Sequence, residues 1–174
     1  QSSAIVRGMS AVVRERATEH GQEVTISCRD GVLLRGHLWH AEGAVLGSVI
    51  VNPATGVQAR YYHRYARFLA RHGFDVLTYD YRGIGLSRPE RLRGCGYRWR
   101  DWGERDFDAA VRFMRARTRH GPLNVVGHSI GGFLPGMAES AIHVDRILTA
   151  GAQYAWWPDY APDRRLGLFL KWHI

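Results

Sequence analysis

The sequence predicts an α/β fold in which a mostly parallel, twisted sheet carries helices on both faces. Short apolar segments alternate with amphipathic segments of helical spacing along most of the 174 residues, and this alternation is typical of parallel sheets with crossover helices. Residues 46–51 are more continuously apolar than their neighbours, as strands covered on both faces are. A turn signal near residue 30 adds a hairpin at the N-terminal end.

The first three strands are predicted at residues 24–28, 33–39 and 46–51. Asp30-Gly31 separates the first two, and this dipeptide is among the strongest signals for a hairpin turn. These two strands should therefore pair antiparallel. Glu42-Gly43 interrupts the pattern before the third strand.

A helix is predicted over residues 61–72, because apolar side chains recur there at i, i+4 and i+7. Gly73 directly after it is a stop signal. Residues 76–79 are the fourth strand, and residues 81–96 form a loop. The face of the helix that is expected to be buried contains Tyr61, Tyr65, Ala66, Phe68 and Leu69.

The second half of the chain continues the alternation. Asp101 and Glu104 have the spacing of a capping box, and the helix behind them ends before Gly121-Pro122. Pro135 removes a hydrogen bond near the start of the next helix and is expected to bend it. The last strand precedes a loop that runs to the end of the chain. The apolar stripe of the helix after Asp101 contains Phe107, Ala110, Val111 and Met114, and the remaining strand, helix and strand are predicted at residues 123–126, 130–141 and 146–150.

Charge and hydropathy along the sequence argue against a nucleic-acid partner and against a membrane span. The chain carries 24 basic and 16 acidic side chains and a formal net charge of +8. The basic residues are scattered along the chain, whereas a nucleic-acid surface concentrates them. No apolar run reaches the roughly 18 residues of a membrane span. We therefore expect no nucleic-acid partner and no membrane span.

Cysteine usage and the first residues bear on the compartment and the domain. Cys28 and Cys95 are the only cysteines; they could form one disulfide but are too few for a framework. Reduced thiols in a cytoplasmic protein are expected. Residues 1–8 resemble a leader or tag before a start at Met9, and residues 9–174 are expected to form one domain or part of one.

A serine stands where a predicted strand meets a predicted helix. Gly127 and Gly131 flank Ser129 two residues away on each side, and they remove side chains that would collide in a sharp strand-to-helix turn. Such a turn lifts the hydroxyl clear of the sheet edge and brings the N–H of Ile130 beside it. A plain turn whose serine caps the helix is the alternative.

Three segments resemble the α/β-hydrolase superfamily, and they agree with it in order and spacing along the chain. Residues 125–132 (VVGHSIGG) resemble its nucleophile elbow, and residues 49–54 (VIVNPA) resemble the strand and loop that carry its second oxyanion donor. Residues 74–87 resemble its D-x-R-G-x-G-x-S segment. The resemblance covers roughly residues 24–150 and is strongest to serine-aminopeptidase-like and lysophospholipase-like hydrolases, many of them uncharacterised bacterial proteins. It implies the α/β-hydrolase fold, truncated after the sixth strand.

The resemblance implies a serine hydrolase that cleaves an ester, thioester or amide through an acyl-serine intermediate. Ser129 would be the nucleophile, and the N–H of Ile130 would be one oxyanion donor. Ala54, aligned by loop length, would be the other donor, and Thr55 is the next candidate. Asn52-Pro53 stands where the superfamily has His-Gly, so the second donor stays open.

Three further residues match family positions with structural roles. Asp80 is expected to organise its loop rather than to serve as the triad acid. Arg82 is expected to be structural, and Ser87 to close the loop.

The superfamily places its acid and then its histidine after the serine in the chain, beyond the sixth strand. His143 and His173 are not expected to act as the base, since one follows the helix after the elbow and the other is one residue from the end of the chain. Asp159 is the best local candidate for the acid. We therefore expect the chain to be the N-terminal part of a longer hydrolase and to be inactive alone.

Substrate and partners follow from the same resemblance. A small-molecule acyl substrate is expected, and His128, Trp156 and Trp157 are candidate substrate contacts. No metal or organic cofactor is needed for this chemistry. The exposed sheet edge of a truncated fold favours pairing with another chain, such as a homodimer. The alternative function is a non-catalytic module of the same fold that binds a small apolar ligand or a partner chain.

Overall fold

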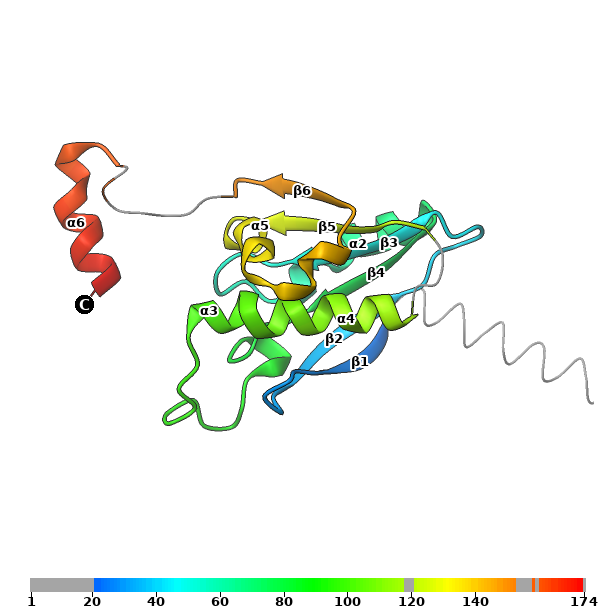
Figure 1. Ribbon diagram of the computed structural model, residues 1–174, viewed down its shortest axis with the longest axis horizontal. Helices are drawn as coiled ribbons and strands as arrows, with labels where there is room; N and C mark the ends of the chain where they lie inside the picture. Colours follow the sequence, from blue (N-terminus) through cyan, green and yellow to red (C-terminus); the bar gives the residue numbers. More distant parts are fainter. Residues whose placement is uncertain (1–20, 118–120, 153–157, 159, 174) are drawn as a thin grey trace, which may run out of the picture.

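The computed structural model describes residues 21–117, 121–152, 158 and 160–173. Six strands form one twisted sheet in the order β1-β2-β4-β3-β5-β6 (Figure 1). The strands are β1 (Gln22–Ser27), β2 (Leu33–Trp39), β3 (Gly47–Asn52), β4 (Phe74–Tyr79), β5 (Leu123–His128) and β6 (Arg146–Ala150). The pairs β1·β2 and β2·β4 are antiparallel, and the other pairs are parallel. The mostly parallel sheet and the N-terminal hairpin are confirmed.

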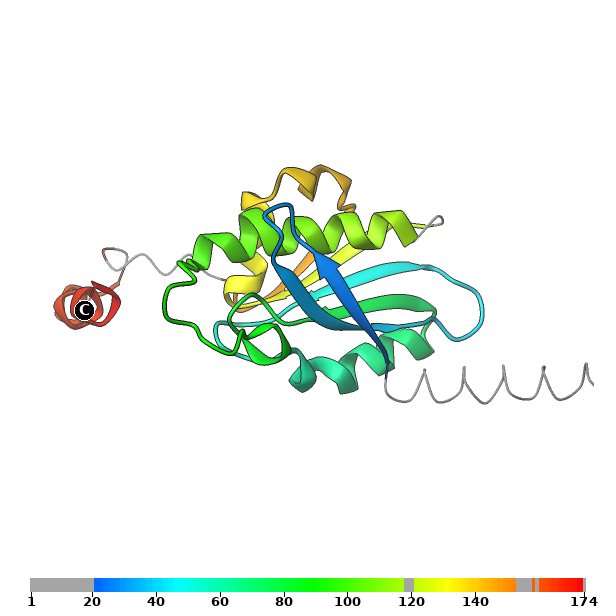
Figure 2. The ribbon, with the colours of Figure 1, turned by 90° about the horizontal axis from the view of Figure 1, so that it is seen from below.

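Helices lie on both faces of this sheet, as predicted. Figure 2 shows α2 on one side of the strands and α4 on the other. The α helices are α2 (His63–Arg71), α3 (Trp99–Asp101), α4 (Asp108–Arg117), α5 (Ile130–Phe133) and α6 (Pro162–His173). The 3-10 helices are η1 (Ala59–Tyr62), η2 (Gly85–Ser87), η4 (Leu134–Met137) and η5 (Glu139–His143), and η3 (Trp102–Phe107) is a π-helical segment.

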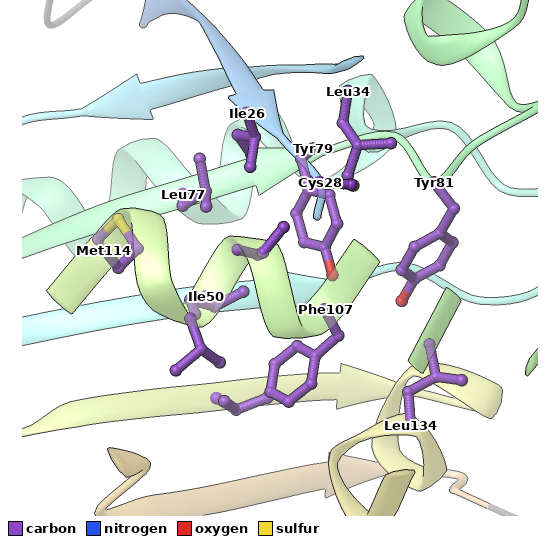
Figure 3. Packing of buried hydrophobic residues seen from close by; sticks show 14 of the residues in the cluster. Ile26, Cys28, Leu34, Ile50, Leu77, Tyr79, Tyr81, Phe107, Met114 and Leu134 are labelled. Carbon is purple, nitrogen blue, oxygen red and sulfur yellow. The ribbon is translucent and has the colours of Figure 1, made fainter. Parts of the chain in front are cut away.

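Two apolar clusters fill the spaces between the layers. Strand β3 is buried along its whole length and supplies both clusters, because its side chains alternate between the faces. Val49 and Val51 pack on the α2 side with Ala66 and Ala70. Ile50 packs on the α4 side, where the larger cluster lies (Figure 3). That cluster includes Tyr79, Tyr81, Phe107, Met114 and Leu134.

The predicted buried face of the first helix is confirmed for Ala66 and Leu69, which belong to or pack against the α2-side cluster, and is wrong for its aromatic residues. Ala66 and Ala70 are its buried residues, whereas Tyr61, Tyr65 and Phe68 are exposed. The face turned to the sheet is set by the small residues, because they let the helix approach the strands closely. The aromatic side chains pack along the outside instead, where the Tyr65 and Phe68 rings lie 6.4 Å apart.

The predicted capping box also falls in the wrong place. The helix begins three residues earlier, at Trp99, and the Arg98 N–H donates to the Asp101 carboxylate over 2.8 Å. Asp101 thus closes the first turn rather than preceding it. Glu104 pairs with the Arg100 guanidinium instead. A π-helical turn, η3, then leads into α4.

The predicted helix over residues 130–141 is not continuous. It divides into α5, η4 and η5. Pro135 lies at the start of η4, and its missing N–H and ring prevent the α-helical pattern from continuing through it. The break exceeds the bend that was expected.

The end of the chain differs from the predicted loop. Residues 162–173 form helix α6, whose signal is Pro162 at the first position, Asp163 in the first turn, and apolar residues at 166, 169 and 170. Residues 1–8 and Met9 lie outside the described residues. In the described part of the chain, no helix has the length and apolar character needed to cross a membrane.

Candidate active site

Ser129 occupies the junction between β5 and α5, at the carboxyl edge of the sheet. Its backbone angles are φ 53° and ψ −122°, and it is the only non-glycine residue with positive φ in the described part of the chain. Such a conformation costs on the order of 1–3 kcal/mol. The Ser129 N–H donates to the Ala150 carbonyl over 2.9 Å, which fixes the turn to the end of β6.

Glycines around Ser129 permit close contact between backbones. A Cβ on Gly131 would lie 2.3 Å from the Asn52 carbonyl oxygen, and one on Gly127 would lie 2.4 Å from the Gly132 Cα. Neither position has room for a side chain. The turn therefore packs directly on the end of β3, as a nucleophile elbow requires.

Asn52 ties the turn to the core. Its side-chain amide donates to the Gly131 carbonyl over 3.0 Å and its oxygen accepts from the Tyr79 hydroxyl over 2.9 Å. Both Asn52 and Tyr79 are completely buried, so each hydrogen bond is protected from water. Asn52 therefore links the serine turn to the core, at a position where the superfamily has histidine.

Tyr62 connects the two sides of the candidate site. Its hydroxyl accepts the Ala54 N–H over 3.0 Å and lies 2.9 Å from the His128 Nδ1. Burial raises the pKa of Tyr62, so the hydroxyl is neutral. The Ala54 N–H, which the sequence assigns to the oxyanion hole, is therefore already hydrogen-bonded to the Tyr62 hydroxyl oxygen.

Asp80 organises its loop, as predicted. Its two carboxylate oxygens accept the N–H groups of Ala59 and Leu86 over 2.7 and 2.8 Å. Ser87 closes the loop, since its hydroxyl donates to the Asp80 carbonyl over 2.6 Å and accepts the Arg35 N–H over 2.9 Å. Both oxygens of Asp80 therefore hold the backbone of their own loop and of η1 in place.

Arg82 is a buried structural residue, as predicted. Its Nε donates to Asp106 over 2.6 Å, and its two terminal nitrogens donate to the two carboxylate oxygens of Asp30. Burial raises the pKa of Asp106 to about 6, although the Arg82 N–H and guanidinium act in the opposite direction. Cys28 donates to the same carboxylate over 3.6 Å.

Both cysteines are free, so the disulfide alternative is wrong.

The remaining candidates do not join Ser129 in one cluster. Thr55 is exposed. His143 precedes β6 while Ser129 follows β5, and these strands run parallel in register, so roughly 15 Å of strand separates them. The side chain of His173 and all of Trp156, Trp157 and Asp159 lie outside the described residues. In the described part of the chain, no group of three metal-binding side chains is present.

The sequence interpretation missed Tyr62 and the bracing role of Asn52. Tyr62 follows the oxyanion loop by eight residues, and only the fold brings its hydroxyl back onto Ala54. Asn52 was noted only as a departure from the family pattern. A polar residue directly after the apolar run Val49-Ile50-Val51 was the available signal.

Comparisons with known proteins agree with this architecture. A family model described as serine aminopeptidase, S33, matches residues 43–172. The α/β hydrolase GrgF from Penicillium sp. sh18 is 24% identical with a TM-score of 0.66, over 87% of this chain and 52% of that one. An esterase from Pyrococcus furiosus is 22% identical with a TM-score of 0.63, over 87% and 55%. A monoglyceride lipase variant from Saccharomyces cerevisiae is 19% identical with a TM-score of 0.64, over 84% and 48%.

The chain therefore spans about half the length of these structures. No curated protein gives a significant match. The structural likeness, all below 25% identity, supports the fold, and the family match covers most of the sequence. Together with the strained serine turn, it leads to one conclusion: the chain belongs to the serine aminopeptidase S33 family of α/β hydrolases.

Proposed function

We propose that the whole protein is a serine hydrolase that cleaves an ester, thioester or amide, with Ser129 as nucleophile. The observation that carries the proposal is the positive φ of Ser129 at a glycine-packed strand-to-helix turn. A plain serine cap needs no such strain, because N-cap residues adopt ordinary extended backbone angles. Strain that the surrounding packing maintains is typical of functional positions.

The reaction proceeds in two steps. Ser129 Oγ attacks the substrate carbonyl carbon, its proton passes to a base, and the leaving alcohol, thiol or amine departs with that proton. Water then attacks the acyl carbon of the acyl-serine and gives up a proton to the same base. The bond between the acyl carbon and Oγ breaks, the carboxylic acid leaves, and the base returns the proton to Ser129 Oγ. We assign the histidine base and its acid partner to the part of the fold that this chain does not cover, since it spans about half the length of its structural relatives, and we expect residues 1–174 alone to be inactive.

The oxyanion is held by the N–H groups of Ile130 and Ala54. Ile130 opens α5, so its N–H has no partner within that helix. The Ala54 N–H donates a hydrogen bond to the Tyr62 hydroxyl. The position of this hydroxyl oxygen is where the substrate oxyanion would accept the same N–H. Substrate must displace this hydroxyl to use the Ala54 N–H, and Thr55 is the less favoured donor.

The substrate is proposed to be a small acyl compound. His128 is exposed beside the nucleophile, and Trp156 and Trp157 remain candidate contacts. Strand β6 is exposed along its whole length, which supports association of this chain through that sheet edge. The chemistry requires neither metal nor organic cofactor.

A non-catalytic module of the same fold is the second candidate. The observation that favours it is the engagement of His128 by Tyr62, together with the position of His143 at the far end of the strands. Such a module would use the same surface to bind a small apolar ligand or a partner chain.

A fluorophosphonate probe distinguishes the two candidates. We expect the whole protein to be labelled at Ser129 and the Ser129→Ala variant to remain unlabelled. Ser27→Ala is the matched control, because Ser27 is an exposed serine on β1, and it should be labelled like the parent. Residues 1–174 alone should react far more slowly. Absence of label on Ser129 in the whole protein would contradict the hydrolase proposal.

A further inference from the structure

A second concave site, whose lining does not include Ser129, lies on the α2 side of the sheet. A cavity of about 320 Å³ opens between β2, the start of α2 and η2. Its lining comes from residues 35–37, 58–60, 63, 80 and 85–86, so it contains neither the elbow nor Tyr62. Its volume is at the lower end of the range for small-molecule pockets.

Basic side chains from two elements converge on this cavity. Arg35 and His37 alternate along β2 and therefore share one face of the sheet. Arg60 and His63 are three residues apart across η1 and the start of α2, so they share one side of the helix. All four line the cavity. The two histidine rings meet edge to face, with centroids 4.6 Å apart.

In the described part of the chain, neither arginine of this cluster forms an ion pair. Asp80 is the one acidic residue of the lining, and both its oxygens already accept backbone N–H groups. Arg35 donates to the hydroxyl of Thr25, and the Arg60 guanidinium lies over the Tyr61 ring. Within the described part of the chain, neither guanidinium has a carboxylate within 4.0 Å.

The histidines have unmet hydrogen-bonding capacity. Nδ1 of His37 and Nε2 of His63 are buried and have no hydrogen-bond partner among the described residues. Burial lowers the pKa of His63 to about 4, and His37 and Arg67 add to this effect. Buried polar atoms are normally paired, so each of these two ring nitrogens can form one further hydrogen bond with a bound molecule.

We propose that this cavity binds a small organic molecule through a phosphate or carboxylate group, with Arg35 and Arg60 pairing with the anion. The imidazoles of His37 and His63 contribute further hydrogen bonds from the wall. Ala59 and Leu86 supply apolar lining for the rest of the molecule. A cation is disfavoured because the Arg35 and Arg60 guanidiniums are positively charged and the one carboxylate of the lining, Asp80, is buried and already accepts two backbone N–H groups.

Isothermal titration calorimetry at low salt tests the proposal with inorganic phosphate, phenyl phosphate and benzoate. We expect binding of at least one of them at roughly millimolar concentration or below. Preference for phenyl phosphate or for benzoate identifies the anionic group. Benzyl alcohol, which has the ring but no charge, should not bind. Failure of all three anions to bind would overturn the proposal.

Charge variants locate the site. Arg35→Gln and Arg60→Gln should each weaken binding about tenfold or more, since each removes a charge-assisted pair. Arg35 and Arg60 are exposed, so both variants should fold, which their melting temperatures can verify. Arg64→Gln is the matched control, because Arg64 is an exposed arginine near Arg60 that does not line the cavity.

The affinity of Arg64→Gln should be within twofold of that of the parent. An equal loss of affinity in Arg64→Gln would mean that the net charge of the protein, and not this cavity, determines binding, and it would overturn the proposal. Ser129→Ala separates this site from the proposed active site. Binding should be unchanged in that variant, and its loss would place the anion at the elbow instead. The inference therefore stands or fails independently of the hydrolase proposal.

Discussion

At the scale of single residues, the Tyr62 hydroxyl competes with substrate for the Ala54 N–H. We predict that Tyr62→Phe raises kcat/KM of the whole protein about fivefold, because a neutral hydrogen bond contributes about 1 kcal/mol net. Steady-state kinetics on a small ester would measure the change. Tyr65→Phe on the outer side of α2 is the control and should have no effect. A tenfold fall in Tyr62→Phe would instead show that the hydroxyl stabilises the transition state.

The two cysteines should differ sharply in reactivity. Burial, reinforced by the charge of Asp106, raises the pKa of Cys28 to about 12, so its thiolate is scarce at neutral pH. Cys95 is half-buried in the loop after β4. We predict that a thiol reagent modifies Cys95 in the native protein and Cys28 only after unfolding. Mass spectrometry of Cys95→Ala before and after denaturation checks this, and rapid labelling of native Cys28 would contradict it.

At the scale of elements, local sequence predicted the strands better than the helices. The β5–α5 turn was predictable because the pattern of glycines around the serine is a local sequence signal, although Gly131 packs on the distant Asn52. The continuous helix after it was wrong, since Pro135 allows only a short α-helical turn before η4. The buried face of α2 could not be read from periodicity, because Ala66 and Ala70 fit the sheet more closely than the aromatic stripe does.

The elbow itself should tolerate no side chain at Gly131. A Cβ there would meet the Asn52 carbonyl at 2.3 Å and the Pro53 carbonyl at 2.7 Å, and both are backbone atoms that cannot rotate away. We predict that Gly131→Ala lowers the free energy of unfolding by about 2 kcal/mol or more. Urea denaturation followed by circular dichroism measures it.

Gly136→Ala is the matched control for this prediction. Gly136 lies five residues further on in η4, has negative φ, and would place its Cβ in open space. It should leave stability unchanged or raise it slightly, because alanine reduces the freedom of the unfolded chain. Equal stability of Gly131→Ala and Gly136→Ala would mean that the elbow does not pack on β3 as described.

At the scale of the whole molecule, the two sheet edges are unlike each other. Edge strand β1 carries Gln22, Glu23 and Thr25, whereas edge strand β6 carries Ile147 and Leu148, which are 48% and 61% exposed. The alternation of strands and helices predicted a mostly parallel sheet, and the resemblance predicted an exposed edge, but the order of the strands within the sheet came only from the structure. It could not place the triad, because the chain spans about half the length of the structures that it matches.

An uncovered apolar edge strand is a template for pairing with another strand. We predict that residues 1–174 self-associate through β6 and that Leu148→Lys weakens this association about tenfold, since a charge on the edge opposes pairing of identical strands. Leu33→Lys is the matched control, because Leu33 is 57% exposed but lies at the start of β2, away from β6. Sedimentation velocity over a range of concentrations measures both variants. A monomer at all concentrations, or an equal effect of Leu33→Lys, would contradict association through this edge.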